Sequence, residues 1–242
     1  MVEEDRLEID ASGKVRARRV RRLGELVVED RLIERPDPAL LVKILLARVR
    51  EKGLGALSWN EAGTGLRQRI AFLRGLTPDA WPDVSDAALL DTLDAWLSPL
   101  LEGCSSLAQV GGEALEQAIR DLLPWEMLRR LDIEAPVRFT VPTGSSLSID
   151  YSAEGGPRLE VRVQELFGLD RHPSIAGGRY PLTLSLLSPA RRPVQVTRDL
   201  PGFWNGSWKA VRADMRGRYP RHPWPENPLE APPTTRAKPR GV

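Results

Sequence analysis

Residues 181–204 read PLTLSLLSPARRPVQVTRDLPGFW, and this stretch specifies a strand, a turn, a second strand and the start of a helix. Apolar residues fill 182–187 and alternate with polar ones over 193–197, which is typical of strands. The intervening SPARRP has turn chemistry, because proline presets φ and serine can bond to nearby backbone. We therefore predict a strand pair followed by a helix, a combination that belongs to the α+β class.

Short segments of the same kind lie upstream of this stretch and are separated by the turn sequences PTGSS, EGGP and AGG. They are found near 137–141, 146–151 and 159–163. Together with the two later strands they predict a small, mainly antiparallel sheet in a domain over 135–228. Residues 199–216 are expected to be helical, with breaks at Gly202 and Gly206.

The end of this domain, RGRYPRHPWPENP at 216–228, is unusual in composition. Proline lacks the N–H that helices and central strands need, so neither structure is expected here. The stretch is too aromatic for a plain linker, and one interpretation is a rigid strap that crosses the domain. Residues 229–242 are rich in Pro, Thr, Lys and Arg and are predicted to be a disordered basic tail.

Residues 36–134 predict a helical segment in the middle of the chain. Asp37 followed by Pro38 is a helix start, and Ser58 begins the capping box of a second helix. Pro99 is expected to end a third helix. Three tryptophans lie on the apolar stripes of these helices and are predicted to be core residues: Trp59, Trp96 and Trp125.

Residues 1–35 predict a β-hairpin, because RLEID and KVRAR alternate on either side of a Ser12-Gly13 turn. The alternation slips at Arg18-Arg19, which predicts a bulge there. A lone hairpin is marginal in water, so we expect partner strands upstream. The fold class predicted for the whole chain is α+β: an N-terminal hairpin, a helical middle segment and a small C-terminal sheet with flanking helices.

Charge is distributed unevenly along the 242 residues. Basic and acidic residues nearly cancel overall, at 35 against 33. From Arg191 onward there are 11 basic and 4 acidic residues, a balance of +7, while the first 190 residues hold 24 and 29, a balance of −5. This gradient indicates an anionic partner for the basic end, with a solvated tail as the alternative.

The sequence offers little to an independent active site. Gly13-Lys14 lacks the spacing of a phosphate-binding loop, and no DExH box is present. Cys104 is the only cysteine, so a cysteine zinc site and an internal disulfide are excluded. His172 and His222 each precede a proline and are interpreted as surface or structural histidines. No metal and no catalytic residue is predicted.

A location inside the bacterial cytoplasm is expected from two further features. The first ten residues are acidic and contain no apolar run, unlike a secretory signal. No stretch approaches the roughly 20 apolar residues of a membrane helix, so no membrane insertion is predicted.

The first basic constellation is RARRVRR in the hairpin. On a strand, Arg16 and Arg18 point to one side while Val15 and Ala17 point to the other. Such a ladder suits a phosphate backbone. The alternative is a solvated strand face or a charge-guarded sheet edge, with nearby acids that weaken the local field.

The second basic constellation lies in the C-terminal block and interleaves cations with aromatics. The predicted phosphate-binding residues are Arg191, Arg192, Arg198, Lys209, Arg212, Arg216, Arg218 and Arg221. Single-stranded nucleic acids are bound in this way, with cations on phosphates and rings on bases. The candidates for base stacking are Trp208, Tyr219 and Trp224. Packing against the sheet is the favoured alternative for the aromatics, since Phe203, Trp204 and Trp208 fit one helix face.

Three motifs in the C-terminal half of the chain carry a family resemblance: VPTGS at 141–145, LLSPARRPVQVTRDLPGFW at 186–204 and GRYPRHPWPENP at 217–228. They resemble the C-terminal region of the HrpB family of bacterial DEAH-box ATP-dependent helicases. The similarity is densest from about 122 to 240 and, through RRLGELVVEDRLIE and RQRIAFLRGL, covers nearly the whole chain. Trp208 stands where a tyrosine is usual and Arg221 where a lysine is usual, and both keep the chemical character.

The resemblance implies an accessory region that follows two RecA-like motor domains. Those domains would carry the ATP and magnesium sites, so no cofactor is expected in this chain. Residues 1–35 would then be the end of a barrel-like module. We predict that the accessory region binds the backbone of single-stranded RNA without reading sequence. The alternative is a protein-interaction module, because prolines pre-order an exposed recognition surface.

Overall fold

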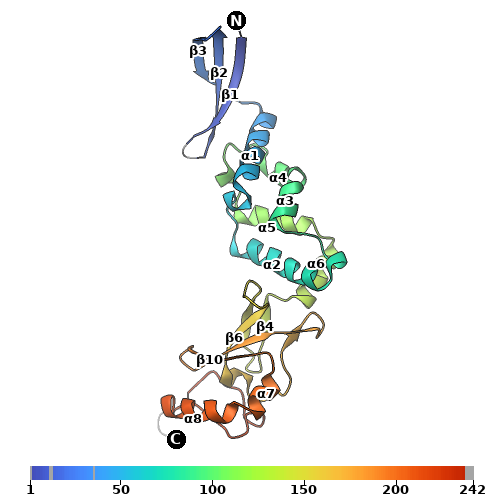
Figure 1. Ribbon diagram of the computed structural model, residues 1–242, viewed down its shortest axis with the longest axis vertical. Helices are drawn as coiled ribbons and strands as arrows, with labels where there is room; N and C mark the ends of the chain where they lie inside the picture. The colour runs from blue at the N-terminus through green and yellow to red at the C-terminus, as the bar shows by residue number, and fades with distance from the viewer. Residues whose placement is uncertain (1, 11–12, 35, 238–242) are drawn as a thin grey trace. The chain divides into compact units, whose positions relative to one another are not determined.

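The computed structural model describes residues 2–10, 13–34 and 36–237. The chain divides into two compact units, residues 1–125 and 126–242, which we call the first and second unit (Figure 1). The division falls at the start of a helix, ahead of the boundary predicted at residue 134. Each unit is described by itself.

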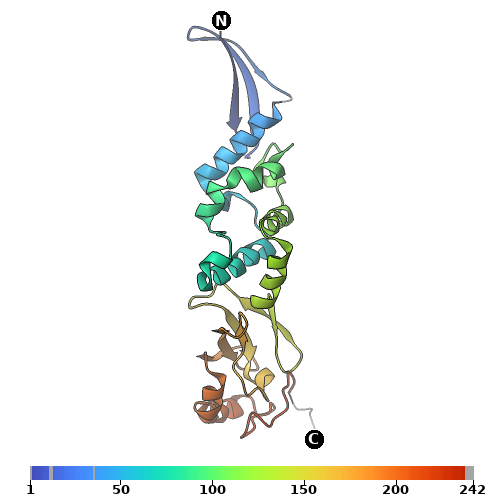
Figure 2. The same ribbon diagram turned by 90° about the vertical axis from the view of Figure 1, so that its right-hand side faces the viewer.

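A three-stranded antiparallel sheet opens the first unit (Figures 1 and 2). Its strands are β1 (Val2–Ile9), β2 (Val15–Leu23) and β3 (Leu26–Leu32), with β2 in the centre. The predicted hairpin is therefore extended by a third strand. Val15 and Ala17 are buried on one face of β2, as the alternation predicts, and Val20, at the opposite parity, is buried as well. The bulge predicted at Arg18-Arg19 is wrong, because the register shifts between Arg21 and Arg22, where β2 meets β3.

Helices form the rest of the first unit. They are α1 (Pro38–Lys52), η1 (Leu54–Ala56), α2 (Glu61–Leu76), η2 (Pro78–Ala80), α3 (Asp86–Asp91), α4 (Leu93–Leu101), η3 (Leu107–Gln109), α5 (Gly112–Asp121) and the start of α6 (Trp125–Glu134). The Asp37 side chain accepts a hydrogen bond from the Ala39 N–H, so the predicted helix start at Asp37-Pro38 is confirmed. Leucines of α1, α2, α4 and α5 fill a common core between these helices.

Three details of the predicted helices are wrong. Asn60, not Ser58, caps α2, because its side-chain oxygen accepts from the Gly63 N–H at 2.7 Å. Pro99 lies inside α4 instead of ending a helix. Trp125 is 60% exposed and is not a core residue, while Trp96 is 5% exposed and is.

The second unit contains a five-stranded sheet with strand order β10-β9-β6-β5-β4. The bounds are β4 (Arg138–Thr140), β5 (Ser146–Asp150), β6 (Arg158–Arg162), β9 (Thr183–Leu187) and β10 (Pro193–Thr197). These agree with all five predicted segments. The pairing is antiparallel except between β6 and β9, which are parallel. A two-stranded ribbon of β7 (Ser174–Ile175) and β8 (Tyr180–Pro181) was not predicted, because two-residue strands leave no periodic signal.

The strand β9 lies inside this sheet, between β10 and β6, and is buried along its whole length. After β10 the chain forms α7 (Leu200–Asn205) and α8 (Trp208–Arg218). The predicted break at Gly206 separates them, whereas the break predicted at Gly202 is wrong, because Gly202 lies inside α7. An aromatic cluster connects these helices to η4 (Val163–Leu166) and the residue after it. Its members are Phe167, Phe203, Trp204, Trp208 and Trp224. The predicted α+β class is confirmed.

The tail after residue 228 is held against η4 as far as the structure describes it. The Thr234 N–H donates to the Gln164 carbonyl at 3.0 Å, and the Arg162 side chain donates to the Thr235 carbonyl at 3.3 Å. Residues 229–237 thus make contacts with the folded unit that a disordered tail was not expected to make. Residues 238–242 of that prediction lie outside the described residues.

Candidate nucleic-acid interface

The surface of α8 follows from its pattern of buried and exposed positions. Trp208 and Met215 face the interior, at a spacing of seven residues. Lys209, Arg212 and Arg216 recur at spacings of three and four, so they share a face that flanks the buried side of the helix. Lys209 and Arg216 are exposed, while Arg212 is half-buried.

The turn between β9 and β10 presents two more cations. Ser188 is buried, and its hydroxyl accepts a hydrogen bond from the Arg192 N–H at 3.1 Å. This closed turn leaves the side chains of Arg191 and Arg192 exposed. Arg191 has a φ of 59°, a left-handed conformation that is uncommon for residues other than glycine.

Two hydrogen bonds fix α8 beside this strand pair. The hydroxyls of Ser188 and Tyr219 lie 3.4 Å apart, which joins the turn to the C-terminal end of α8. At the other end, the Ser207 hydroxyl donates to the Gln195 side chain at 2.8 Å. The cations of the turn and of the helix therefore belong to one region of the second unit. We call Arg191, Arg192, Lys209 and Arg216 the open cations, because within the described residues none of them makes an ion pair.

Other predicted cations of this block are engaged by the protein itself. The Arg212 guanidinium donates to the Trp224 carbonyl at 2.9 Å and pairs with Glu226 at 3.1 Å. Arg218 pairs with Asp214, one helical turn earlier, at 3.0 Å. Arg221 is exposed and neighbours His222, and it has interactions of its own.

Arg198 lies apart from the open cations and has a structural role. Its guanidinium donates to the Thr183 hydroxyl at 2.9 Å, the Gly155 carbonyl at 2.5 Å and the Tyr180 hydroxyl at 2.6 Å. It also lies over the Tyr180 ring, 5.2 Å from the centroid. These contacts use three of the five N–H donors and hold the guanidinium against the unit itself, so the prediction that Arg198 holds phosphate does not fit its surroundings.

Arginines of the N-terminal sheet face carboxylates. Arg16 pairs with Asp10 at 2.7 Å and Arg18 with Asp30 at 2.8 Å. The hydrogen bond from Arg18 lowers the pKa of the Asp30 carboxyl below its ordinary value. The strand face predicted as a basic ladder is therefore largely neutralised, and the alternative of a charge-guarded sheet describes it better.

The aromatics proposed for stacking are mostly packed inside the protein. Trp208 is 2% exposed and lies edge-on to Phe167, with ring centroids 5.7 Å apart. Trp224 is 8% exposed, and its indole N–H donates to the Tyr219 carbonyl at 2.9 Å. Trp208 offers no face to a base in this conformation, which corrects its assignment as a stacking residue. The spacing of Trp204 and Trp208 signalled this packing.

The histidines have structural surroundings. The Leu200 N–H donates to Nδ1 of His172 at 3.0 Å, so Nε2 carries the proton and donates to the Leu182 carbonyl at 2.7 Å. The pKa of His222 is lowered, first by burial and then by the charges of Arg162 and Arg221. Among the described residues no cluster of three or more His, Cys, Asp or Glu side chains could hold a metal ion.

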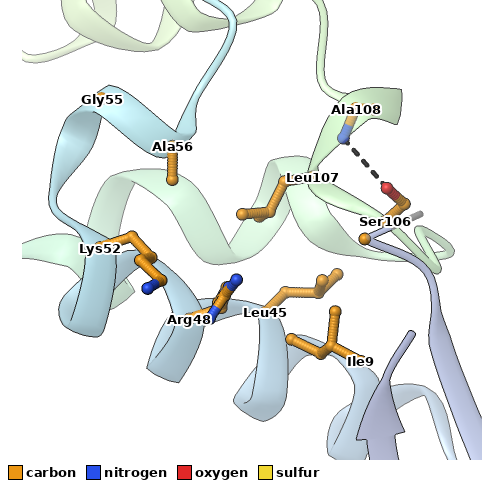
Figure 3. Close-up of a pocket in the computed structure, with 10 residues that line it drawn as sticks. Ile9, Leu45, Arg48, Lys52, Gly55, Ala56, Ser106, Leu107 and Ala108 are labelled. Carbon is orange, nitrogen blue, oxygen red and sulfur yellow. Dashed lines mark hydrogen bonds between the residues drawn. The ribbon is translucent and has the colours of Figure 1, made fainter. Parts of the chain in front are cut away.

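A hollow of about 440 Å³ in the first unit lies beside α1, η1 and η3 (Figure 3). Three apolar side chains form its floor: Ile9, Leu45 and Leu107. Arg48 and Lys52 reach over it from α1, but Glu51 pairs with them at 3.0 and 3.4 Å. The hollow is thus mainly apolar, and its lining does not form a catalytic group of residues.

No described helix combines the length and the apolar character needed to cross a bilayer.

Comparison with known proteins defines the class. A family model described as ATP-dependent helicase C-terminal matches residues 96–228, which is more than half of the chain. The class is therefore the C-terminal region of ATP-dependent helicases. Within that class, the chain belongs to the HrpB C-terminal family, as its motifs predicted.

Curated and solved relatives agree with this assignment. The chain is 43% identical over 230 residues to the ATP-dependent RNA helicase HrpB of Escherichia coli strain K12, a match that covers 95% of the chain and 28% of the relative. A crystal structure of E. coli DExH-box NTPase HrpB matches 96% of the chain at 41% identity and a TM-score of 0.80. A second, of the E. coli DEAH/RHA helicase HrpB, matches 92% with a TM-score of 0.69. The chain spans 29% and 28% of those two structures, less than a third of each.

Proposed function

We propose that the chain is the non-catalytic C-terminal accessory region of an HrpB-type RNA helicase. It holds the backbone of single-stranded RNA for RecA-like motor domains elsewhere in the longer protein. ATP and magnesium belong to those motor domains. The sequence of this chain supports the division of labour, because it contains neither a phosphate-binding loop nor a DExH box.

The observation that carries this proposal is the set of open cations, Arg191, Arg192, Lys209 and Arg216. Their charges face solvent without a carboxylate partner among the described residues, so they are available to an anion. Guanidinium and ammonium groups bind phosphate oxygens and displace condensed counterions, which gives affinity without sequence readout. The named relative is an RNA helicase, and this favours RNA as the polyanion.

The test is the salt dependence of RNA binding by the 242-residue chain. Each neutralised phosphate of a single strand contributes about 0.7 to the slope of log K against log salt. Four open cations therefore predict a slope near −3, with binding measured by the fluorescence anisotropy of a labelled oligoribonucleotide. The variant with Arg191→Ala, Arg192→Ala, Lys209→Ala and Arg216→Ala should lose most of this slope.

A matched variant separates specific cations from total charge. Arg16→Ala with Arg18→Ala removes two arginines that already have carboxylate partners, so the slope should stay as it is. A slope that falls with this pair, or that does not fall with the four open cations, contradicts the proposal. Loss of a protein partner with unchanged RNA affinity in the fourfold variant would favour the interaction-module alternative.

A further inference from the structure

A pocket of about 510 Å³ lies in the second unit between the strap, residues 216–228, and the tail that follows it. The strap contributes one wall and the tail contributes the other. The lining residues that matter are Pro223, Trp224 and Pro225 on the strap and Ala231, Pro232 and Arg236 on the tail. The volume lies within the range of roughly 300–1,000 Å³ of small-ligand sites.

One buried residue holds both walls. Gln164 is 2% exposed, and its side-chain N–H donates to the Pro223 carbonyl at 3.1 Å. The carbonyl of the same residue accepts from the Thr234 N–H at 3.0 Å. A third bond, from the Gly168 N–H to the Pro228 carbonyl at 2.9 Å, fixes the corner where the strap becomes the tail. The pocket is thus a built feature with anchored walls.

The lining combines flat apolar rings with a single cation. Trp224, which is 8% exposed, packs on Trp208 with ring centroids 6.1 Å apart and borders the pocket beside the proline rings. The lining contains no carboxylate, and within the described residues the Arg236 side chain makes no ion pair. A flat, electron-rich ring joined to a negative charge matches this chemistry, because bases stack on such surfaces and guanidinium groups hold phosphates.

We propose that this pocket takes one base of a single-stranded RNA, stacked on the proline rings and the exposed part of Trp224, with a neighbouring phosphate on Arg236. The inference rests on the proposed function and adds to it a binding site for one base. The Arg212 side chain, which donates to the Trp224 carbonyl, connects the pocket wall to the face of α8 that carries Lys209 and Arg216. A strand held by the open cations therefore has an anchor for one base beside them.

A proline-rich peptide is the competing occupant, since such peptides dock in grooves lined by aromatic and proline rings. It leaves Arg236 without a partner, whereas a nucleotide satisfies both the rings and the cation. The observations favour the nucleotide, and the peptide becomes an outcome of the test.

The experiment compares two oligomers of about eight nucleotides, a length within the site size of single-strand binders. One is an oligouridylate, and the other has the same sugars and phosphates but no bases. Stacking of one base, by the usual energies of such contacts, makes the first bind about 5- to 150-fold more tightly to the 242-residue chain. Both should show the same salt slope, because they carry the same phosphates.

The variant Ala231→Phe fills the pocket from its tail wall. We expect it to abolish the preference for the base-bearing strand while leaving the affinity for the abasic strand unchanged. Ala95→Phe, on the exposed surface of α4 in the first unit, is the matched control and should keep the preference. Arg236→Ala, which removes charge without adding bulk, should weaken both strands equally and reduce the salt slope by about 0.7.

The outcomes separate this inference from the proposed function. If neither strand binds with a salt-dependent affinity, the proposed function fails. If both bind but with equal affinity, or if the preference survives Ala231→Phe, the pocket is not the base site. The pocket would instead be a peptide site if a decaproline peptide binds the chain, loses its affinity in the Ala231→Phe variant, and the two RNA strands bind equally.

Discussion

Arginine-rich stretches occur at both ends of this chain, and the fold treats them in opposite ways. In the N-terminal sheet the arginines at 16, 18, 19 and 21 each have a carboxylate within 3.2 Å. In the second unit the open cations have none among the described residues. The number of positive residues in a stretch therefore does not determine the charge of the surface it forms. What decides is which residues the fold places opposite them.

Strand register explains the neutral sheet. Antiparallel pairing sets Asp5 opposite Arg19 and Glu3 opposite Arg21 across β1 and β2. Directly opposed side chains in such a pair lie about 5 Å apart, close enough for ion pairs. On α8 only Asp214 accompanies the cations, and it is used by Arg218. A helix with few acids cannot neutralise itself, so Lys209 and Arg216 stay open.

The largest effect is expected from removing the aromatic packing that holds α8, and with it Lys209 and Arg216, in place. Trp208→Ala deletes a ring that is 2% exposed and packs on Phe167, Phe203 and Trp204. We expect a loss of about 3–5 kcal/mol in the unfolding free energy of the second unit, as for other large-to-small core changes. Denaturant unfolding of the variant measures this loss.

Trp125→Ala is the control for that change, because its ring is 60% exposed. Its cost should be about 1 kcal/mol or less. Equal costs for the two tryptophans would mean that the aromatic cluster does not hold α8 and the strap.

Some features of this fold could be predicted from the sequence and others could not. All five strands of the larger sheet in the second unit and the break at Gly206 follow from local patterns, because alternation and turn residues are local signals. The register of β1 to β3 does not, so the pairing of Arg16 and Arg18 was left open. The tail was predicted as disordered because its anchors, Gln164 and Arg162, act through backbone carbonyls and amides, which leave no sequence signature. Arg236 was not predicted as a site residue, because it lies in this tail.

The strap and the N-terminal sheet should also respond differently to pH. Burial and the charges of Arg162 and Arg221 lower the pKa of His222, whose ring also lies edge-on to Tyr219. The unfolded chain therefore binds a proton that the folded strap resists. Stability of the second unit should fall as the pH drops below the ordinary value of 6.5, and the loss should continue until the folded-state pKa is reached.

Carboxylates of the N-terminal sheet behave in the opposite range. Hydrogen bonds from Arg19 and Arg18 lower the pKa of Asp5 and Asp30, so their stabilising effect is present above the ordinary value of 3.8 and disappears only in stronger acid. Hydrogen exchange measured from pH 7 to pH 4.5 should show loosening near 219–225 and none in β1 to β3. His222→Gln should flatten the response of the strap. If the response persists in that variant, another group is responsible.

The smallest effect is expected from removing single carboxylate partners, which leaves an arginine of the N-terminal sheet and one of the second unit equally unpaired. Asp30→Asn leaves Arg18 without its carboxylate, and Asp214→Asn does the same for Arg218. Exposed ion pairs contribute little to stability, so both variants should remain folded. If pairing alone keeps the sheet from binding RNA, each substitution should steepen the salt slope by up to about 0.7, because each frees one cation for one phosphate. A steeper slope for Asp214→Asn but not for Asp30→Asn would show that position as well as pairing separates the two arginine-rich regions. An unchanged slope in both would mean that carboxylates do not control which arginines meet the strand.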